Sequence, residues 1–124
     1  MNLTIATGSD LSSEYLHMRE ICLRSIEIYC ERYPDIERRC YLLEHHERRF
    51  SWDKIRHIRG ALPETDFVWW IDADAMIIGK QDIRELINPD ATLNIAKDEN
   101  GINCGVMVWK NCAESFGKNP VLLV

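Results

Sequence analysis

The stretch DFVWWIDADAMIIG, residues 66–79, decides the fold. Its first half is continuously apolar and aromatic over residues 67–71, which is typical of a strand buried on both faces of a sheet. Such strands occur in sheets that carry helices on both faces, so we place the central strand of an α/β sheet here. Two carboxylates, Asp72 and Asp74, follow this strand directly.

The segments on either side alternate between strand and helix patterns. Short apolar or β-branched runs predict strands, and apolar residues that recur every three or four positions predict helices. The predicted strands are 3–7, 39–43, 66–71, 92–96 and 106–109. The predicted helices are a long one capped by Ser12 and stopped by Pro34, one over 52–62 and a short one over 82–87, with a loop at 44–49. This alternation predicts an α/β fold whose sheet is largely parallel in its first half.

Composition narrows the class of protein. A chain of 124 residues fits one domain. Its five cysteines form no C-x-x-C pair, which argues against a disulfide framework and a zinc knuckle and favours a reducing compartment. No signal-like N-terminal segment is present, and the apolar run at 67–71 is far too short to span a membrane. We therefore expect a cytoplasmic protein without a membrane span.

Charge is unevenly distributed along the chain. Residues 38–59 carry seven Lys or Arg against three Asp or Glu, a local charge of +4. Because the net charge of the whole chain is −5, the remaining residues carry −9. An acidic chain is a poor general nucleic-acid binder, because that affinity depends on neutralising many phosphates. Two interpretations of the basic segment stay open: a solvated helix face, or a patch for the few phosphates of a small ligand.

Asp72 and Asp74 are candidate metal ligands. In an extended chain residues i and i+2 point to the same side, so both carboxylates would face one cation at the carboxyl end of the strand. Ligands of α/β sheets bind at that end. Hard oxygen ligands favour Mg²⁺ or Mn²⁺, usually completed by phosphate and water. The alternative is a turn in which the aspartates make local hydrogen bonds.

Other motifs carry less. The pair His45-His46 has the side chains of a transition-metal site, but adjacent residues point apart and the segment has the composition of a solvated loop. No G-x-S-x-G elbow or glycine-rich phosphate loop is present.

Three segments together resemble a known family: WDKI at 52–55, WWIDADAMI at 69–77 and GINCGVMVWKNC at 101–112. In this order they resemble the GT-A glycosyltransferases, nearest the galactosyl and xylosyl transferases that use nucleotide sugars. The resemblance implies a GT-A (Rossmann-like) three-layer sandwich with a mixed, mainly parallel sheet, formed by residues 1–124 as a single minimal domain. It also implies a transferase, dependent on Mn²⁺ or Mg²⁺, that moves a hexose from UDP-glucose or UDP-galactose to an unidentified acceptor.

The same resemblance implies roles around the D-x-D motif. Asp72 would contact the donor ribose and the metal, and Asp74 would bind directly to the metal that bridges both phosphates. Ala73, between them, would lie against the donor. Lys54 matches a family lysine near the diphosphate, where an ammonium group is electrostatically favourable.

Two further groups of residues complete the implied donor site. Ala6, Thr7 and Gly8, at the end of the first strand, would border the nucleotide base, commonly uracil in this family. Asp98 and Asn103, at the end of one strand and the start of the next, would face the hydroxyl groups of the donor sugar.

The sequence departs from the family near its end. Members are usually longer, and their C-terminal part supplies a further metal ligand, often a histidine, together with acceptor-binding groups. The last histidine here is His57, so we expect a donor half that is a minimal form of the fold or needs a partner. The apolar residues 121–124 would pack in the core or against a second copy in a homodimer. With two carboxylates only, a cation should bind weakly until a nucleotide diphosphate is present.

Two alternative functions stay open. One is a nucleotide-sugar-binding module without turnover. The other is a haloacid dehalogenase-like phosphatase, which also places D-x-D after an apolar strand. The phosphatase pattern requires an early strand and a threonine after the motif, whereas Ala75 and Met76 follow it here.

Overall fold

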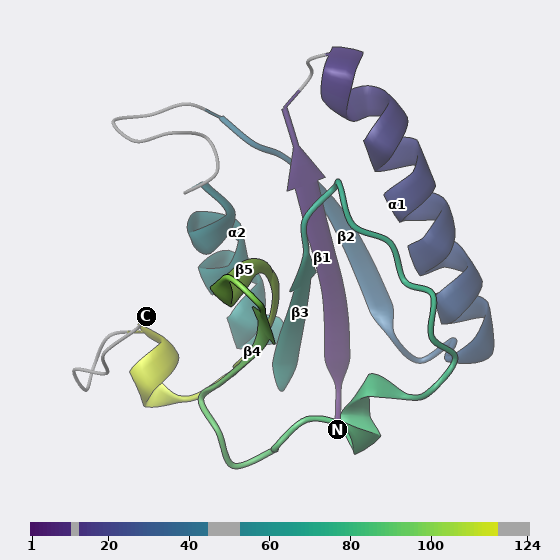
Figure 1. The fold of residues 1–124 in the computed structure, drawn as a ribbon. Coiled ribbons are helices and arrows are strands. Elements are labelled where there is room, and N and C mark those ends of the chain that lie inside the picture. Colours follow the sequence, from purple (N-terminus) through teal and green to yellow (C-terminus); the bar gives the residue numbers. More distant parts are fainter. Residues whose placement is uncertain (11–12, 45–52, 117–124) are drawn as a thin grey trace.

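The computed structural model describes residues 1–10, 13–44 and 53–116, and in them a five-stranded sheet lies between two helices (Figure 1). The strands are β1 (Leu3–Ser9), β2 (Glu37–Leu42), β3 (Phe67–Ile71), β4 (Leu93–Asp98) and β5 (Gly101–Lys110). The helices are α1 (Ser13–Arg32) and α2 (Asp53–Ala61), with short 3₁₀ turns η2 (Leu62–Glu64), η3 (Ile83–Glu85) and η4 (Ala113–Phe116).

The strand order is β2-β1-β3-β5-β4, so β3 is the central strand, as its apolar sequence predicts. β1 pairs in parallel with β2 and β3, whereas β5 runs antiparallel to both of its neighbours, β3 and β4. Among the described strands β5 alone therefore opposes the common direction. The expected α/β sandwich with a mixed, mainly parallel sheet is confirmed.

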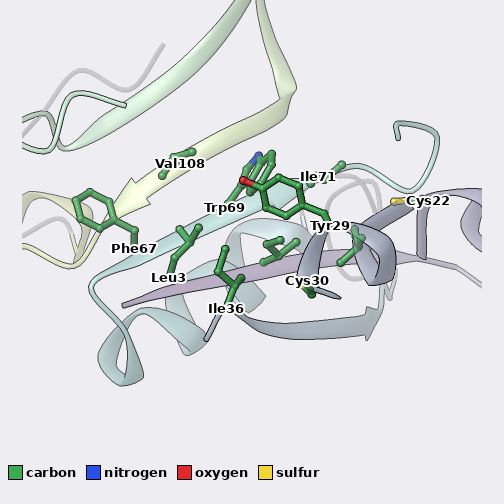
Figure 2. Close-up of a cluster of buried hydrophobic side chains, with 11 residues drawn as sticks. Leu3, Cys22, Tyr29, Cys30, Ile36, Phe67, Trp69, Ile71 and Val108 are labelled. Carbon is green, nitrogen blue, oxygen red and sulfur yellow. The ribbon is translucent and has the colours of Figure 1, made fainter. Parts of the chain in front are cut away.

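Alternating side chains of β3 divide the core into two layers. Its five residues are all buried, which confirms that both faces of the strand are covered. On the α1 face, Trp69 packs edge-on against Tyr29 with ring centroids 5.5 Å apart (Figure 2). On the α2 face, Trp70 packs in a second cluster with Ile58 and Met107. Packing in these two layers holds the carboxyl end of β3 in place.

A segment without regular secondary structure leads from β3 back along α1 (Figure 1). Residues 75–83 form this segment, which we call the strap. Ser25 accepts a hydrogen bond from the main-chain nitrogen of Ile77 at 3.0 Å, and Tyr33 donates to the carbonyl of Lys80 at 2.7 Å. The Tyr29 hydroxyl donates to the Gln81 carbonyl and accepts from the Ile83 nitrogen, both at 2.9 Å. Two side chains of α1, Ser25 and Tyr29, and that of Tyr33, the residue after the helix, thus hold the strap.

Some predicted elements differ from the structure. The predicted helix at 82–87 is only the single turn η3, because the following Asn88-Pro89 disfavours helical backbone. The last strand is longer than the predicted 106–109 because it begins in a hairpin with β4, and Gly101 has the positive φ of 110° that glycine adopts readily. The cap at Ser12, the helix start at Trp52, the chain end at 121–124 and most of the 44–49 loop lie outside the described residues.

Two further observations concern the whole of the described chain. All five cysteines carry free thiols. Neither described helix is both long enough and apolar enough to cross a membrane.

Candidate functional site

The candidate site lies where β3 ends and the first half of β5 begins. The last β3–β5 pair is Ile71 with Val106, so residues 101–105 of β5 extend beyond the end of β3. Because β5 is antiparallel, its early residues meet the carboxyl ends of the parallel strands. This edge is where α/β sheets bind ligands.

The D-x-D motif forms a turn, not the extended chain used to predict that its carboxylates share one side. The Ala75 nitrogen donates to the Asp72 carbonyl at 2.9 Å, which closes the turn. Asp72 is half-buried, Ala73 is buried and Asp74 is exposed. The prediction that both carboxylates point to the same side was therefore wrong, because it assumed an extended backbone. A strand buried on both faces does not continue through charged residues, since burying them unpaired is costly.

The side chain of Asp72 faces the α2 layer. Its Oδ1 accepts a hydrogen bond from Trp70 Nε1 at 2.7 Å and lies 3.4 Å from Lys54 Nζ. Its main-chain nitrogen donates to the Gly105 carbonyl at 2.8 Å. The carboxylate of Asp72 is thus contacted from β3 and α2, and its main chain is held by β5.

Lys54 reaches this edge from the first turn of α2, so the structure brings it together with Asp72. Its side chain is only 13% exposed, and Nζ donates to the Cys104 carbonyl at 2.9 Å as well as contacting Asp72. A lysine is rarely buried to this degree unless it is paired.

A β-bulge in the β4–β5 hairpin orients the carbonyl groups of Cys104 and Gly105. Ile95 pairs with Met107 but the next residue, Ala96, pairs with Asn103, so residues 104–106 have no partner on β4. The Cys104 carbonyl oxygen then accepts a hydrogen bond from the Lys54 ammonium group, and the Gly105 carbonyl oxygen accepts one from the Asp72 main-chain nitrogen. Bulges commonly redirect a strand beside a binding site. Only the glycine in this stretch hinted at the bulge from sequence.

Gly105 allows two functional side chains to approach each other. A Cβ at this position would lie 2.9 Å from Asn103 Oδ1 and 3.1 Å from Asp72 Oδ2. Asn103 Oδ1 also accepts the Gly105 main-chain hydrogen bond at 2.8 Å. Oxygen atoms of Asp72 and Asn103 thus border the space that a side chain at position 105 would occupy.

Asn103 and Asp98 form one unit across the hairpin. Asn103 Nδ2 donates to Asp98 Oδ2 at 3.2 Å, and the Asn100 nitrogen donates to Asp98 Oδ1 at 2.8 Å. Asp98 ends β4 as expected, but Asn103 lies inside β5 and does not begin it. Both side chains are exposed, so both remain accessible to a ligand.

The predicted base-contacting residues Ala6, Thr7 and Gly8 are buried in β1. The Thr7 hydroxyl lies 3.8 Å from the sulfur of Cys22, and that thiol donates to the Asp72 carbonyl at 3.7 Å. Burial raises the pKa of Cys22, and nearby Asp74 and Asp72 raise it further, so the thiol stays protonated at neutral pH. Of the three β1 residues, the described contacts link Thr7 to the D-x-D turn.

A cavity of about 420 Å³ adjoins β1 and β2 on the α1 face. It is lined by Thr7, Leu23, Ile26, Glu27, Arg38, Arg39 and Cys40. Lys54 approaches from the α2 layer, so this cavity and the Asp72 contacts lie on different faces of the sheet.

A second group of charged residues, at the start of α2, was not predicted. Asp53, with a side chain 2% exposed, accepts hydrogen bonds from Arg56 at 2.8 Å and 3.1 Å and from the Glu44 nitrogen at 2.9 Å. His57 lies 3.3 Å from the same carboxylate and stacks on Tyr41. The Arg56 hydrogen bonds, followed by that from Glu44, hold the pKa of Asp53 well below its usual range. Local i, i+3 and i, i+4 spacing was the only sequence signal. His45 and His46 lie outside the described residues.

The donor atoms at the D-x-D turn fit a hard divalent cation. Carboxylate oxygens of Asp72 and Asp74 are the ligand type that Mg²⁺ and Mn²⁺ prefer. Gly105 leaves room beside one of them, because a Cβ there would lie 3.1 Å from Asp72 Oδ2. The described residues hold no cluster of three or more His, Cys, Asp or Glu side chains able to bind a metal.

Comparison with solved structures supports the fold. The chain is similar to the crystal structure of a glycosyltransferase involved in the glycosylation of the major capsid of PBCV-1, with a TM-score of 0.69 and 20% sequence identity. The match covers 95% of this chain but 64% of that chain, so this chain spans about two thirds of the viral enzyme's length. No match was found among curated proteins.

The model of the galactosyl transferase GMA12/MNN10 family matches residues 5–92, which run from β1 to the residue before β4. This match includes Lys54 and the D-x-D turn and covers more than half of the chain. The chain therefore belongs to the galactosyl transferase GMA12/MNN10 family of glycosyltransferases.

Proposed function

We propose that residues 1–124 form one nucleotide-sugar-binding domain that transfers a hexose from UDP-glucose or UDP-galactose to an acceptor. The observation that carries this proposal is the convergence of Asp72, Lys54 and Asn103 around Gly105 at the carboxyl edge of the sheet. The family match supports it, because it includes both Lys54 and the D-x-D turn.

In this proposal Asp72 and Asp74 hold Mn²⁺ or Mg²⁺ at the turn. Such an ion, when bound, neutralises the charge that develops on the departing diphosphate. Trp70 and the Gly105 carbonyl fix Asp72, so its carboxylate needs little reorganisation when the donor arrives. Lys54 adds a positive charge beside the diphosphate.

Asp98 and Asn103 orient the donor sugar. Asn103 is fixed by the Gly105 nitrogen, and Asp98 is fixed by Asn103 and by the Asn100 nitrogen. Their exposed side chains then present a preorganised set of hydrogen-bonding atoms to sugar hydroxyls. Contacts to the base are assigned to the end of β1, at Ala6, Thr7 and Gly8, and because these residues are buried in the ligand-free protein, neighbouring side chains must move to admit the base.

Binding without turnover is the second candidate. The observation in its favour is that the match covers 64% of the similar viral glycosyltransferase, so about a third of that enzyme has no counterpart in the match. A haloacid dehalogenase-like phosphatase has no support from the family match. The engagement of Asp72 Oδ1 by Trp70 and Lys54 also disfavours that residue as a nucleophile.

Calorimetry with UDP tests the donor site. We expect UDP to bind in the presence of Mn²⁺ and to lose at least roughly tenfold in affinity when the metal is removed or Asp74 is changed to Asn. Asp90→Asn, an exposed aspartate between η3 and β4, is the matched control. Unchanged affinity in Asp74→Asn would remove the metal role from this residue.

Product analysis separates the three activities. The chain is incubated with UDP-glucose or UDP-galactose and Mn²⁺, and released UDP, free sugar and inorganic phosphate are measured. Release of UDP with transfer or hydrolysis of the sugar supports the transferase. Tight binding without release supports a binding module, and release of inorganic phosphate supports a phosphatase.

A further inference from the structure

Lys54 is a nearly buried cation in direct contact with a proposed metal ligand. Its ammonium group lies 3.4 Å from Asp72 Oδ1 and 2.9 Å from the Cys104 carbonyl, and its side chain is 13% exposed. Among the described residues, Asp72 is the one carboxylate within ion-pair distance of Lys54. The ion pair is therefore a feature of the ligand-free protein.

Because of this ion pair, Lys54 and a divalent cation would compete for the carboxylate of Asp72. The oxygen of Asp72 that contacts Lys54 also accepts the Trp70 hydrogen bond, and the other oxygen faces Gly105. A divalent ion on Asp72 would lie a few ångströms from the ammonium group. Repulsion between them is only weakly screened, because so little of Lys54 is in contact with solvent.

We propose that Lys54 is a tethered counter-cation that makes metal binding depend on the nucleotide. Without nucleotide, Lys54 neutralises Asp72 and opposes the divalent ion. With nucleotide, the ammonium group turns to the diphosphate, and Asp72 is freed for the metal. This inference rests on the proposed function and assigns Lys54 a regulatory part within it.

The chemistry of lysine suits such an exchange. An ammonium group has three donors on a flexible stem, so one hydrogen bond to the Cys104 carbonyl is kept while another moves from carboxylate to phosphate. The Cys104 carbonyl is available for this purpose because the bulge in β5 removes it from the pairing with β4. The arrangement couples two ligands through one side chain, and such coupling is reciprocal.

Titration of Mn²⁺, followed by the electron paramagnetic resonance of the free ion, tests this inference. The dissociation constant is measured with and without UDP for the wild type, Lys54→Met and Lys54→Gln. The glutamine variant keeps a donor for the Cys104 carbonyl and loses only the charge, so it covers the case in which the methionine variant fails to fold. Thermal melting verifies the fold of each variant.

We expect both variants to bind Mn²⁺ about tenfold more tightly than the wild type in the absence of UDP. The factor by which UDP strengthens Mn²⁺ binding should shrink correspondingly. Lys80→Met, which removes an exposed positive charge from the strap, should leave both quantities unchanged.

The outcomes separate this inference from the proposed function. If the wild type shows UDP-dependent Mn²⁺ binding and the Lys54 variants keep the wild-type constants, Lys54 is not a counter-cation and the donor site stands. If Mn²⁺ binds more weakly in both variants, Lys54 assists the metal, which overturns the inference. If the wild type binds no Mn²⁺ even with UDP, the metal-dependent donor site fails as well.

Discussion

The main-chain nitrogen of Asp72 donates a hydrogen bond to the carbonyl oxygen of Gly105 at 2.8 Å, one step beyond the last β3–β5 pair. This bond continues the sheet for one residue after β3 has ended. It ties the start of the D-x-D turn to β5, so the position of Asp72 depends on the bulged part of that strand. Asp72 directly follows β3 and Gly105 lies in β5, so both residues lie at the carboxyl edge of the sheet.

Replacing Gly105 with Ala tests this dependence. The new Cβ would meet Asn103 Oδ1 at 2.9 Å and Asp72 Oδ2 at 3.1 Å, so one or both oxygens must move. We expect a loss of roughly tenfold in the affinity for UDP with Mn²⁺, similar to the loss of an outer-shell partner of a metal ligand. Calorimetry measures it.

Gly79→Ala is the control for this substitution, because no atom lies within 4 Å of the added Cβ at that position. It should leave the affinity unchanged. Equal affinity in Gly105→Ala and the wild type would mean that neither oxygen takes part in binding.

Asp98 and Asn103 should act as a unit in turnover. Each substitution to Ala breaks the 3.2 Å hydrogen bond between them, so we expect each to lower kcat/KM by roughly tenfold or more. The double variant should be little worse than either single variant. UDP affinity should change less than turnover, because these side chains face the sugar in the proposed site.

Asn100→Ala provides the comparison for this pair, since its main-chain nitrogen, not its side chain, contacts Asp98. Steady-state kinetics with UDP-glucose or UDP-galactose and UDP calorimetry are measured on the same preparations. Strictly additive losses, or losses in UDP affinity as large as those in turnover, would contradict a shared role at the sugar.

Asp53 should contribute stability that depends on pH. Its pKa is lowered in the folded state, chiefly by the Arg56 hydrogen bonds, so folding favours the ionised form. This contribution is complete above the unfolded pKa, about 4, and is lost as pH falls toward the lower folded pKa. Asp53→Asn should lose about 2 kcal/mol at pH 7 and show a flatter decline below pH 4.

Urea unfolding between pH 2 and pH 7 measures this effect. Asp90→Asn, at an exposed position, should follow the wild-type curve. A variant curve parallel to the wild type throughout the acid range would show that Asp53 has no part in the pH dependence.

Tyr29→Phe should loosen the strap. The substitution removes the hydroxyl that serves both the Gln81 carbonyl and the Ile83 nitrogen, while the ring can still pack against Trp69. We expect a loss of about 2 kcal/mol in the free energy of unfolding, because two main-chain groups lose their partner. Tyr33→Phe removes one exposed bond and should lose less than half as much. Similar losses in both variants would contradict the double role of Tyr29.

The central part of the fold could be predicted from sequence because it depends on local patterns. Five consecutive apolar residues identified β3 as a strand covered on both faces, and apolar residues that recur every three or four positions identified α1 as a helix. Asp72 followed from its place after β3. These inferences need only side-chain periodicity and burial, which neighbouring residues report.

The geometry of the site could not be predicted in the same way. The turn at Asp72 depends on a hydrogen bond to Gly105, which is distant in sequence, and the bulge in β5 depends on its register with β4. The family resemblance placed Asn103 at the start of a strand. In the structure Asn103 lies inside β5, because the hairpin pairs it with Ala96.

The hydrogen bond from Asp72 to β5 also joins parts of the site that are far apart in the chain and are synthesised at different times. β1, α1, β2 and β3 bring their contacts together from the earlier part of the chain, whereas β5 must close a loop of about 35 residues onto β3. A chain synthesised from its N-terminus therefore exposes Asp72 and Lys54 before the carbonyl groups that hold them exist in place. In the proposed function, binding of a nucleotide would therefore indicate that β3 and β5 have paired, which is the long-range step of sheet formation.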